Sequence, residues 1–247
     1  MKVQLIAATQ IDPEALRLIG YEPHPYVEND YDNPLGDYDA DELAEFAGRN
    51  CYRSFNRPNP ATAENEDYLK HILDVGHESV LEHGSATFYI KTSRSVLTEL
   101  ERHRHLSFSV VSQRYVDPTP LGFQMPPAAL ELLNADGRGY FDAKEIIYDC
   151  WHHAAEGYEH LTDIFTEAGL PRKKAREAAR SVLPNMTNSP MVVTGNHRAW
   201  RYVIKARWHE AADAEIRELA GELLRQLREI APNSYQDIPD HPYSYGG

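Results

Sequence analysis

The stretch SATFYIKTSRSVLTELERHRHLSFSVVSQRY, residues 85–115, carries the clearest fold signals of the chain. In its first seven residues, Ala86, Phe88 and Ile90 alternate with more polar side chains. Alternation with a period of two is typical of a strand that buries one face. Residues 85–91 are therefore predicted to form a half-buried strand.

A helical pattern follows this strand. Val96, Leu100 and His103 fall on one side of a helix over residues 95–105. The spacing predicts that the chain leaves this helix near Leu106.

The end of the quoted stretch, residues 108–115, is predicted to be extended. In an extended chain Val110, Ser112 and Arg114 point to one face. The opposite face then takes the remaining residues, Ser109, Val111, Gln113 and Tyr115.

The rest of the chain reads as mainly helical, and its length of 247 residues favours one domain of above-average size. The acidic segment from Glu28 to Glu45 is expected to be a solvated loop that runs into a helix, and a polar tail, about 232–247, is expected at the surface. The other expected elements are a buried strand at 3–8, a helix at 40–52, a helix that ends at Gly76, helices at about 127–134, 139–168 and 171–183, and one long helix from about Asn196 to Ile230.

Composition excludes several classes of protein. The formal net charge of -13 argues against a general binder of nucleic acid or of acidic membranes, so an anionic ligand needs a local basic cluster. The sequence shows no secretory signal and no apolar run of membrane-spanning length. Two cysteines, Cys51 and Cys150, are too few for a disulfide framework. A cytoplasmic protein is the simplest expectation.

Arg207 is unusual because it falls in an apolar helical stripe with Trp200, Val203 and Ile204. Removal of an unpaired charge from water is costly, so Arg207 should have a carboxylate or a ligand anion as partner. An arginine that snorkels to solvent or forms an internal salt bridge is an equally good interpretation.

A second set of arginines, Arg172, Arg176 and Arg180, recurs every four residues. A solvated helix face explains Arg172 and its lysine neighbours. Arg180 precedes the apolar residues SVLP and is the best candidate to reach inward.

The third set of cations lies in the quoted stretch, at Arg102, His103, Arg104 and Arg114. Guanidinium groups bind phosphate with two parallel hydrogen bonds, and the hydroxyl of Ser112 can add another. Together with Arg180 and Arg207, these residues indicate a pocket for a phosphorylated planar molecule. Each arginine taken alone is more often an ion-pair partner.

Other chemistries find little support. His77 and His83 are six residues apart, which misses the spacing of a zinc-binding H-E-x-x-H helix, so no metal is expected. The sequence has no glycine-rich phosphate loop. Both cysteines lie outside the basic cluster in sequence, and inert thiols are the better interpretation than nucleophiles.

The motifs permit a family assignment by resemblance. Arg102 to Arg104 followed by Ser112 resembles the R-H-R-x7-S signature of flavin-dependent thymidylate synthases. GHESVLEH, SQRY, ARSVLP and TGNHRAWR also occur in the order and approximate spacing of that family. The resemblance implies a homotetramer of α+β subunits, each with a mainly antiparallel sheet flanked by long helices, and active sites shared between subunits.

The resemblance further implies methylation of deoxyuridine monophosphate (dUMP), with 5,10-methylenetetrahydrofolate as carbon donor and FAD reduced by NADPH as hydride source. The residues that it assigns to flavin are Ser79, Arg102, His103, Arg104, Asn196, His197, Arg198 and Tyr202. Those that it assigns to the nucleotide are Glu99, Arg102, Val110, Val111, Ser112, Gln113, Arg114, Arg180 and Arg207. A non-catalytic nucleotide-binding or RNA-binding module, or a structural homologue, is the alternative.

Within that resemblance Arg207 acquires a catalytic role. It would sit at the uracil ring and favour ionisation at N3, and no protein nucleophile would be needed. Arg114 and Arg180 would bind and orient the substrate. Two positions depart from the family: Val110 replaces a Glu or Gln, and Tyr202 replaces a His or Asn. Both changes are expected to tune affinity and to leave the chemistry intact.

Overall fold

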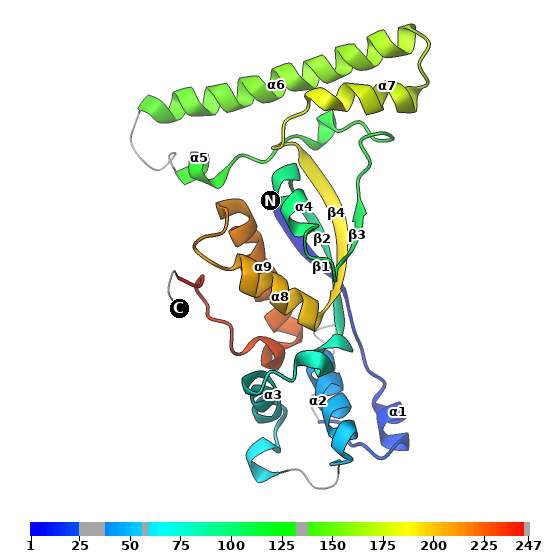
Figure 1. Cartoon of the computed structure of the whole chain (residues 1–247), viewed down its shortest axis with the longest axis vertical. Helices are drawn as coiled ribbons and strands as arrows, with labels where there is room; N and C mark the ends of the chain where they lie inside the picture. The colour runs from blue at the N-terminus through cyan, green and yellow to red at the C-terminus, as the bar shows by residue number, and fades with distance from the viewer. Residues whose placement is uncertain (25–37, 56–58, 132–137, 245–247) are drawn as a thin grey trace. The chain divides into compact units, whose positions relative to one another are not determined.

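A computed structural model of the chain describes residues 1–24, 38–55, 59–131 and 138–244, with side chains described from residue 142 in the last range. Its sheet has four strands in the order β1-β2-β4-β3 (Figure 1). The strands are β1 (Lys2–Ala8), β2 (Ser85–Ser93), β3 (Ser107–Val110) and β4 (Asn188–Asn196). Neighbouring strands run antiparallel, as the pairings Thr9 with Ser85, Arg94 with Thr187, and Val111 with Pro190 require.

Strand β2 confirms the predicted alternation. Ala86, Phe88, Ile90 and Thr92 are fully buried, while the residues between them are only partly covered. The strand lies between two neighbours in the sheet, so both of its edges are hydrogen-bonded.

Strand β1 is not the buried strand that its apolar sequence predicted. It is an edge strand in which only Leu5 is buried, and Ile6 is exposed. The side chain of Gln226 accepts a hydrogen bond from the Leu5 amide at 2.7 Å and donates one to the Val3 carbonyl at 3.0 Å. A helix side chain thus satisfies backbone groups of the strand edge, which would otherwise be open to another chain.

The helices mostly match the expected ones. The predicted helices at 40–52 and 139–168 are confirmed, and the helix expected to end at Gly76 ends at Asp74. The prediction at 127–134 is confirmed as far as Glu131, because 132–134 lie outside the described residues. The helices are α1 (Pro13–Leu18), α2 (Asp39–Tyr52), α3 (Asn65–Asp74), α4 (Arg94–Leu100), α5 (Pro127–Glu131), α6 (Arg138–Glu167), α7 (Arg172–Ala179), α8 (His197–Arg207) and α9 (Ala214–Ile230), with short 3-10 turns that include η3 (Glu78–Glu82), η6 (Arg180–Val182) and η7 (Pro232–Tyr235).

The single long helix predicted from Asn196 to Ile230 is wrong, because α8 ends at Arg207 and α9 begins at Ala214. Trp208 stabilises the connection between α8 and α9. Its carbonyl accepts from the Tyr243 amide at 2.9 Å, and its indole donates to the Pro239 carbonyl at 3.1 Å. A Cβ at position 221 would approach the Trp208 ring to 2.5 Å, so Gly221 gives the ring its space on α9. Because apolar residues recur at helical spacing on both sides of this connection, the spacing did not indicate a break between the two helices.

The acidic segment and the tail also differ from expectation. Residues 28–37 lie outside the described residues, but Asp41, Glu42 and Glu45 are buried on α2 and not solvated. The tail was expected at the surface, yet Tyr235 and Ile238 are almost completely buried. Hydrogen bonds from Ser234 to Asp41 and from Arg201 to Asp237 satisfy polar groups of these segments.

The chain divides into two compact units. The sheet-and-helix unit comprises residues 3–89, 103–108 and 192–247, and its core includes a cluster of α2, α3 and η3 around Leu69 and Leu81. The arm unit comprises residues 1–2, 90–102 and 109–191, in which α6 and α7 pack together and bury Ala175 and Ala179. Organisation as a single domain stays a prediction. None of the helices in the described ranges combines the length and apolar character that crossing a lipid bilayer requires.

Candidate active site

The basic residues of the RHR motif lie in a turn and not on the helix predicted for them. Helix α4 ends at Leu100, because the amide of Arg102 bonds the Glu99 carbonyl and tightens the last turn. In this turn His103 is buried, with 7% of its surface exposed, whereas Arg102 and Arg104 face solvent. The motif therefore supplies one buried imidazole between two exposed guanidinium groups.

His103 contacts two other residues of the predicted site. Nε of Arg207 donates to Nε2 of His103 at 3.1 Å, and the rings of His103 and Tyr202 pack edge to face with centroids 5.5 Å apart. Burial, together with the Arg207 charge, lowers the pKa of His103 to about 4. His103 is thus neutral at pH 7, and because Nε2 accepts, the proton is on Nδ1.

This Nδ1 is a buried donor with no hydrogen-bond partner among the described residues. Buried polar atoms are normally satisfied, and an orphan in a native site indicates a ligand or water. An acceptor atom of a flavin would satisfy it, and the exposed cations Arg104 and Arg198 could neutralise a diphosphate. The residues of this unit therefore fit FAD.

The start of α8 holds several residues assigned to flavin. The side chain of Asn196 caps the helix by accepting from the Ala199 amide at 2.8 Å, and Arg198 pairs with Glu82. Ser79 is exposed on η3. His197, in contrast, turns inward: its Nδ1 lies 2.9 Å from the Tyr235 hydroxyl, and burial lowers its pKa to about 4.

The fully buried arginine of α8 is Arg201, whereas Arg207 is only half-buried. The apolar stripe had indicated Arg207 as the core-facing cation. Arg201 donates to both carboxylate oxygens of Asp237, at 2.7 and 2.8 Å, and to Glu78 at 3.2 Å. Although burial alone would raise it, the hydrogen bond and charge of Arg201 lower the pKa of Asp237. Sequence reasoning missed Arg201, although it shares a helix face with His197 and Ile204.

The nucleotide residues after β3 do not follow the predicted alternation. Val110 ends the strand, and the amide of Val111 bonds Pro190. A turn follows, in which the Ser112 carbonyl accepts from the amides of Tyr115 and Val116. Gln113 is buried in this turn. The Arg114 side chain is 44% exposed, and its Nη1 lies 3.8 Å from a carboxylate oxygen of Glu177. The predicted extended segment is therefore correct only as far as Val111.

In the second arginine set the inward residue is Arg176, not Arg180. Arg176 is buried and donates to the Tyr115 carbonyl at 2.6 Å, whereas Arg180 lies exposed in η6. Helix α7 ends at Ala179, before the predicted end at 183. Exposure leaves Arg180 available to a ligand.

The predicted site residues are divided between the two units. The flavin set belongs to the sheet-and-helix unit except for Arg102, and the nucleotide set belongs to the arm unit except for Arg207. Glu99 is half-buried on α4. The functional roles of the flavin residues and of the nucleotide residues stay predictions.

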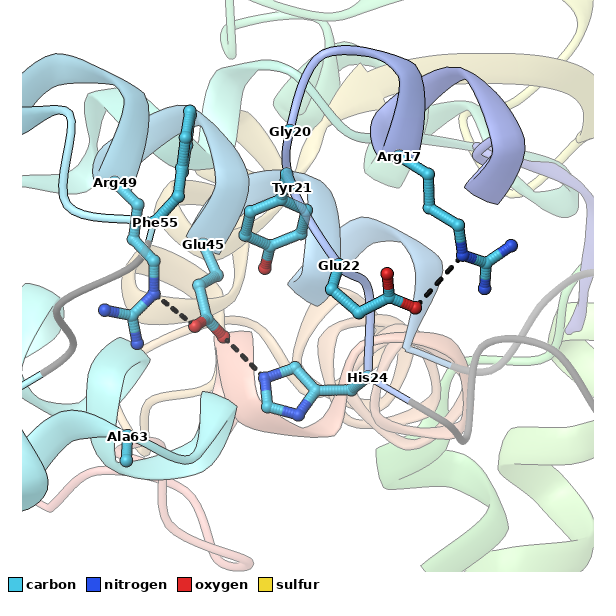
Figure 2. A pocket seen from close by; sticks show the side chains of 9 residues that line it. All are labelled: Arg17, Gly20, Tyr21, Glu22, His24, Glu45, Arg49, Phe55 and Ala63. Atoms are coloured by element: carbon cyan, nitrogen blue, oxygen red, sulfur yellow. Dashed lines mark hydrogen bonds and ion pairs between the residues drawn. The ribbon is translucent and has the colours of Figure 1, made fainter.

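A cluster with metal-ligand chemistry lies elsewhere in the sheet-and-helix unit, at His24, Glu42 and Glu45. Two of its members, His24 and Glu45, line a pocket, and Figure 2 shows Arg49 and His24 on opposite sides of the Glu45 carboxylate. Glu45 also accepts from Asn65 at 2.7 Å, and these bonds use both of its oxygens. The hydrogen bond to Glu45 raises the pKa of His24. A proton on the His24 imidazole can therefore offset the negative charge of the Glu45 carboxylate.

The structure is that of an α+β protein with exposed arginines in each of its two units. Residues 35–233 match the model of a family described as thymidylate synthase complementing protein. The chain is 72% identical over 246 residues to a probable flavin-dependent thymidylate synthase of Mycobacterium phage L5, covering 99% of this chain and all of the relative. It is 70% identical to the corresponding protein of Mycobacterium phage D29, across the full length of both chains. A flavin-dependent thymidylate synthase of Mycobacteroides abscessus is 50% identical over 199 residues, 79% of this chain and 78% of the relative.

The chain therefore belongs to the flavin-dependent thymidylate synthase family, which confirms the resemblance found in its motifs. It is a member of an enzyme family.

Proposed function

We propose that this enzyme converts dUMP to thymidylate by reductive methylation. 5,10-Methylenetetrahydrofolate would donate the carbon, and NADPH would be the reductant. Bound FAD would supply the hydride. The residues of the chain would bind and orient the reactants and stabilise charge on the pyrimidine.

The observation that carries this proposal is the contact between Arg207 and His103. A neutral imidazole accepts from Nε of Arg207, and this contact holds the guanidinium in one orientation. A fixed cation in a partly water-excluded site can stabilise an anion that develops on the uracil ring at N3. Arg207 would then act on the substrate without forming a bond to it.

A mechanism without a protein nucleophile is consistent with the positions of the cysteines. Cys51 lies on α2 and Cys150 on α6, and both are exposed free thiols. Neither belongs to the set of residues assigned to the nucleotide.

Binding of the nucleotide would fall to the arm unit. Arg102, Arg114 and Arg180 are exposed there, as groups that await an anion would be. In a homotetramer they could serve the site of a neighbouring subunit, so that one subunit supplies the flavin contacts and another the phosphate contacts.

A product assay tests this function. Purified protein receives dUMP, methylenetetrahydrofolate, NADPH and FAD, and each is omitted in turn while thymidylate is measured. We expect product only in the complete mixture, and a rise in thermal stability when FAD is added. A protein that gains no stability with FAD and forms no thymidylate would refute the proposal.

A further inference from the structure

The segment after Asn233 lies beyond the region that the family model matches, yet its residues Ser234, Tyr235 and Ile238 are buried. We call residues 234–238 the C-terminal clamp. The carboxylate of Asp41 on α2 accepts from the amide of Ser234 at 3.0 Å and from its hydroxyl. Next to the clamp, the Asn233 side chain donates to Asn65 of α3 at 2.8 Å. The clamp is thereby fixed by helices that carry none of the residues assigned to flavin.

The clamp also holds α8, at two points one helical turn apart. Asp237 receives two parallel hydrogen bonds from Arg201, and the Ser234 carbonyl accepts a further one from the same guanidinium. The hydroxyl of Tyr235 meets Nδ1 of His197 at 2.9 Å. Both contacts lie on the face of α8 that is turned away from solvent.

Arg201 extends this connection to η3. Nη2 of Arg201, which also bonds Asp237, donates to Glu78 at 3.2 Å, and Lys205 approaches the same carboxylate at 3.3 Å. Glu78 immediately precedes Ser79, and Glu82 at the end of η3 pairs with Arg198. One buried guanidinium therefore joins the clamp to the two elements that carry most of the expected flavin contacts.

We propose that the C-terminal clamp positions the flavin-binding face of α8 and η3, with Arg201 as the positioning residue. This inference rests on the proposed function. An arginine–carboxylate pair with two parallel hydrogen bonds and a buried guanidinium fixes distance and direction together, which a lysine cannot do. Ligand sites depend on such supporting contacts, because the groups that touch the ligand must be held close to their productive geometry.

The experiment compares Asp237→Asn with Asp240→Asn. Asp240 is a matched control, because it is an acidic residue of the same tail that pairs with Arg228 on α9 at an exposed position. Circular dichroism and thermal melting establish the folded fraction of each variant. FAD affinity is measured by fluorescence titration, and kcat and KM for FAD are measured in the product assay.

For Asp237→Asn we expect KM and Kd for FAD to rise about tenfold, the lower end of what loss of an outer-shell partner costs at metal sites. At saturating FAD, kcat should return to near the wild-type value. Asp240→Asn should leave both constants within about twofold, because exposed ion pairs contribute little. Loss of thermal stability with unchanged FAD constants would show a purely structural clamp and overturn the inference.

A second variant keeps the test decisive if Asp237→Asn does not fold. Glu78→Gln removes the link to η3 while it leaves the pair between Arg201 and Asp237 intact, and the same rise in KM for FAD is expected. A folded Glu78→Gln protein with wild-type constants would contradict the inference. A wild-type protein that fails to bind FAD would refute the proposed function itself, and the inference with it.

Discussion

The two units of the chain treat their charged side chains differently. In the sheet-and-helix unit, the buried arginines are paired with carboxylates, as in Arg49 with Glu45 and Arg201 with Asp237. In the arm unit, Arg102, Arg114 and Arg180 are exposed. The first unit presents groups that its own structure has already oriented, and the second presents groups that a ligand or a neighbouring subunit would still have to orient.

This difference matters because the unfavourable desolvation of a buried charge is already compensated when the protein folds. A paired internal cation such as Arg201 can be used as a rigid support, but removal of its partner leaves an uncompensated charge. An exposed cation costs little to keep and contributes little until an anion arrives. Substitutions in the two units should therefore differ in their effects on stability and on ligand binding.

The Arg207→Ala variant should show the largest change. Loss of a fixed donor at developing charge lowers turnover on the order of 10²- to 10³-fold, so thymidylate formation should almost disappear. Arg207 is only half-buried, so the variant should fold and bind FAD. The control is Arg225→Ala, which removes an exposed cation paired with Glu222 and Glu229. Near-normal turnover of Arg207→Ala would remove Arg207 from its assigned role.

Within the arm unit, Arg176→Met and Arg180→Met should have opposite consequences. Arg176→Met should lower the free energy of unfolding by about 2 to 3 kcal/mol, because it leaves the Tyr115 carbonyl without its charged donor. Arg180→Met should change the free energy of unfolding by less than about 0.5 kcal/mol and raise KM for dUMP. Urea denaturation and steady-state kinetics measure the two effects. Equal loss of stability in both variants would contradict the contrast between the buried and the exposed arginine.

His197 should make the sheet-and-helix unit sensitive to acid. Its pKa of about 4 in the folded protein lies below the ordinary value of 6.5, so the unfolded chain binds more protons between these values. The stabilisation is therefore present above pH 6.5 and is lost as the pH falls toward 4. Between pH 7 and pH 5 the loss should be roughly 2 kcal/mol.

Comparison of the wild type with His197→Gln isolates this effect. Burial raises the pKa of Asp41 to about 7, above its ordinary 3.8, so stability from Asp41 changes with pH in the opposite sense. The contribution of Asp41 is common to both proteins and cancels in the difference. The free energy of unfolding should fall less from pH 7 to pH 5 in His197→Gln, and parallel pH profiles would refute the assignment.

Val110→Gln should show the smallest effect. Val110 is half-buried at the end of β3, at a position where the family resemblance led us to expect Glu or Gln. The new amide should tighten FAD or dUMP binding several-fold, about 1 kcal/mol, with kcat unchanged. Titration of both ligands against Val110→Gln and an isosteric control, Val110→Thr, measures the change. Unchanged dissociation constants in Val110→Gln would exclude affinity tuning at this position.

Much of the local structure could be predicted from sequence. The alternation at Ala86, Phe88 and Ile90 correctly predicted β2, and the helices expected at 40–52 and 139–168 are α2 and α6. These patterns are local, because each depends on side chains within a few turns or pairs of residues. The motif around Arg102 and Ser112 identified the family for the same reason, since residue order needs no knowledge of contacts.

The predictions that were wrong concern arginines whose hydrogen-bond partners are distant in sequence. The apolar stripe indicated Arg207 as the inward-facing cation, but the buried arginine is Arg201, which has Asp237, 36 residues further along, and Glu78, 123 residues before it. Arg176 differs from Arg180 through the Tyr115 carbonyl, 61 residues away. Periodicity names the face of a helix, but it does not say whether that face meets a carboxylate, a carbonyl or water.

The residues alone were enough to predict the family, a half-buried strand at 85–91 and the set of cations from which a site could be built. The tertiary structure decided which of those cations are buried, where the last helix breaks at Trp208, and that the polar tail enters the interior. The physical reason is that burial of a charge or a polar backbone is favourable only when hydrogen-bond partners are supplied. In this chain Asp41, Asp237 and Gln226 supply them from segments far away in sequence.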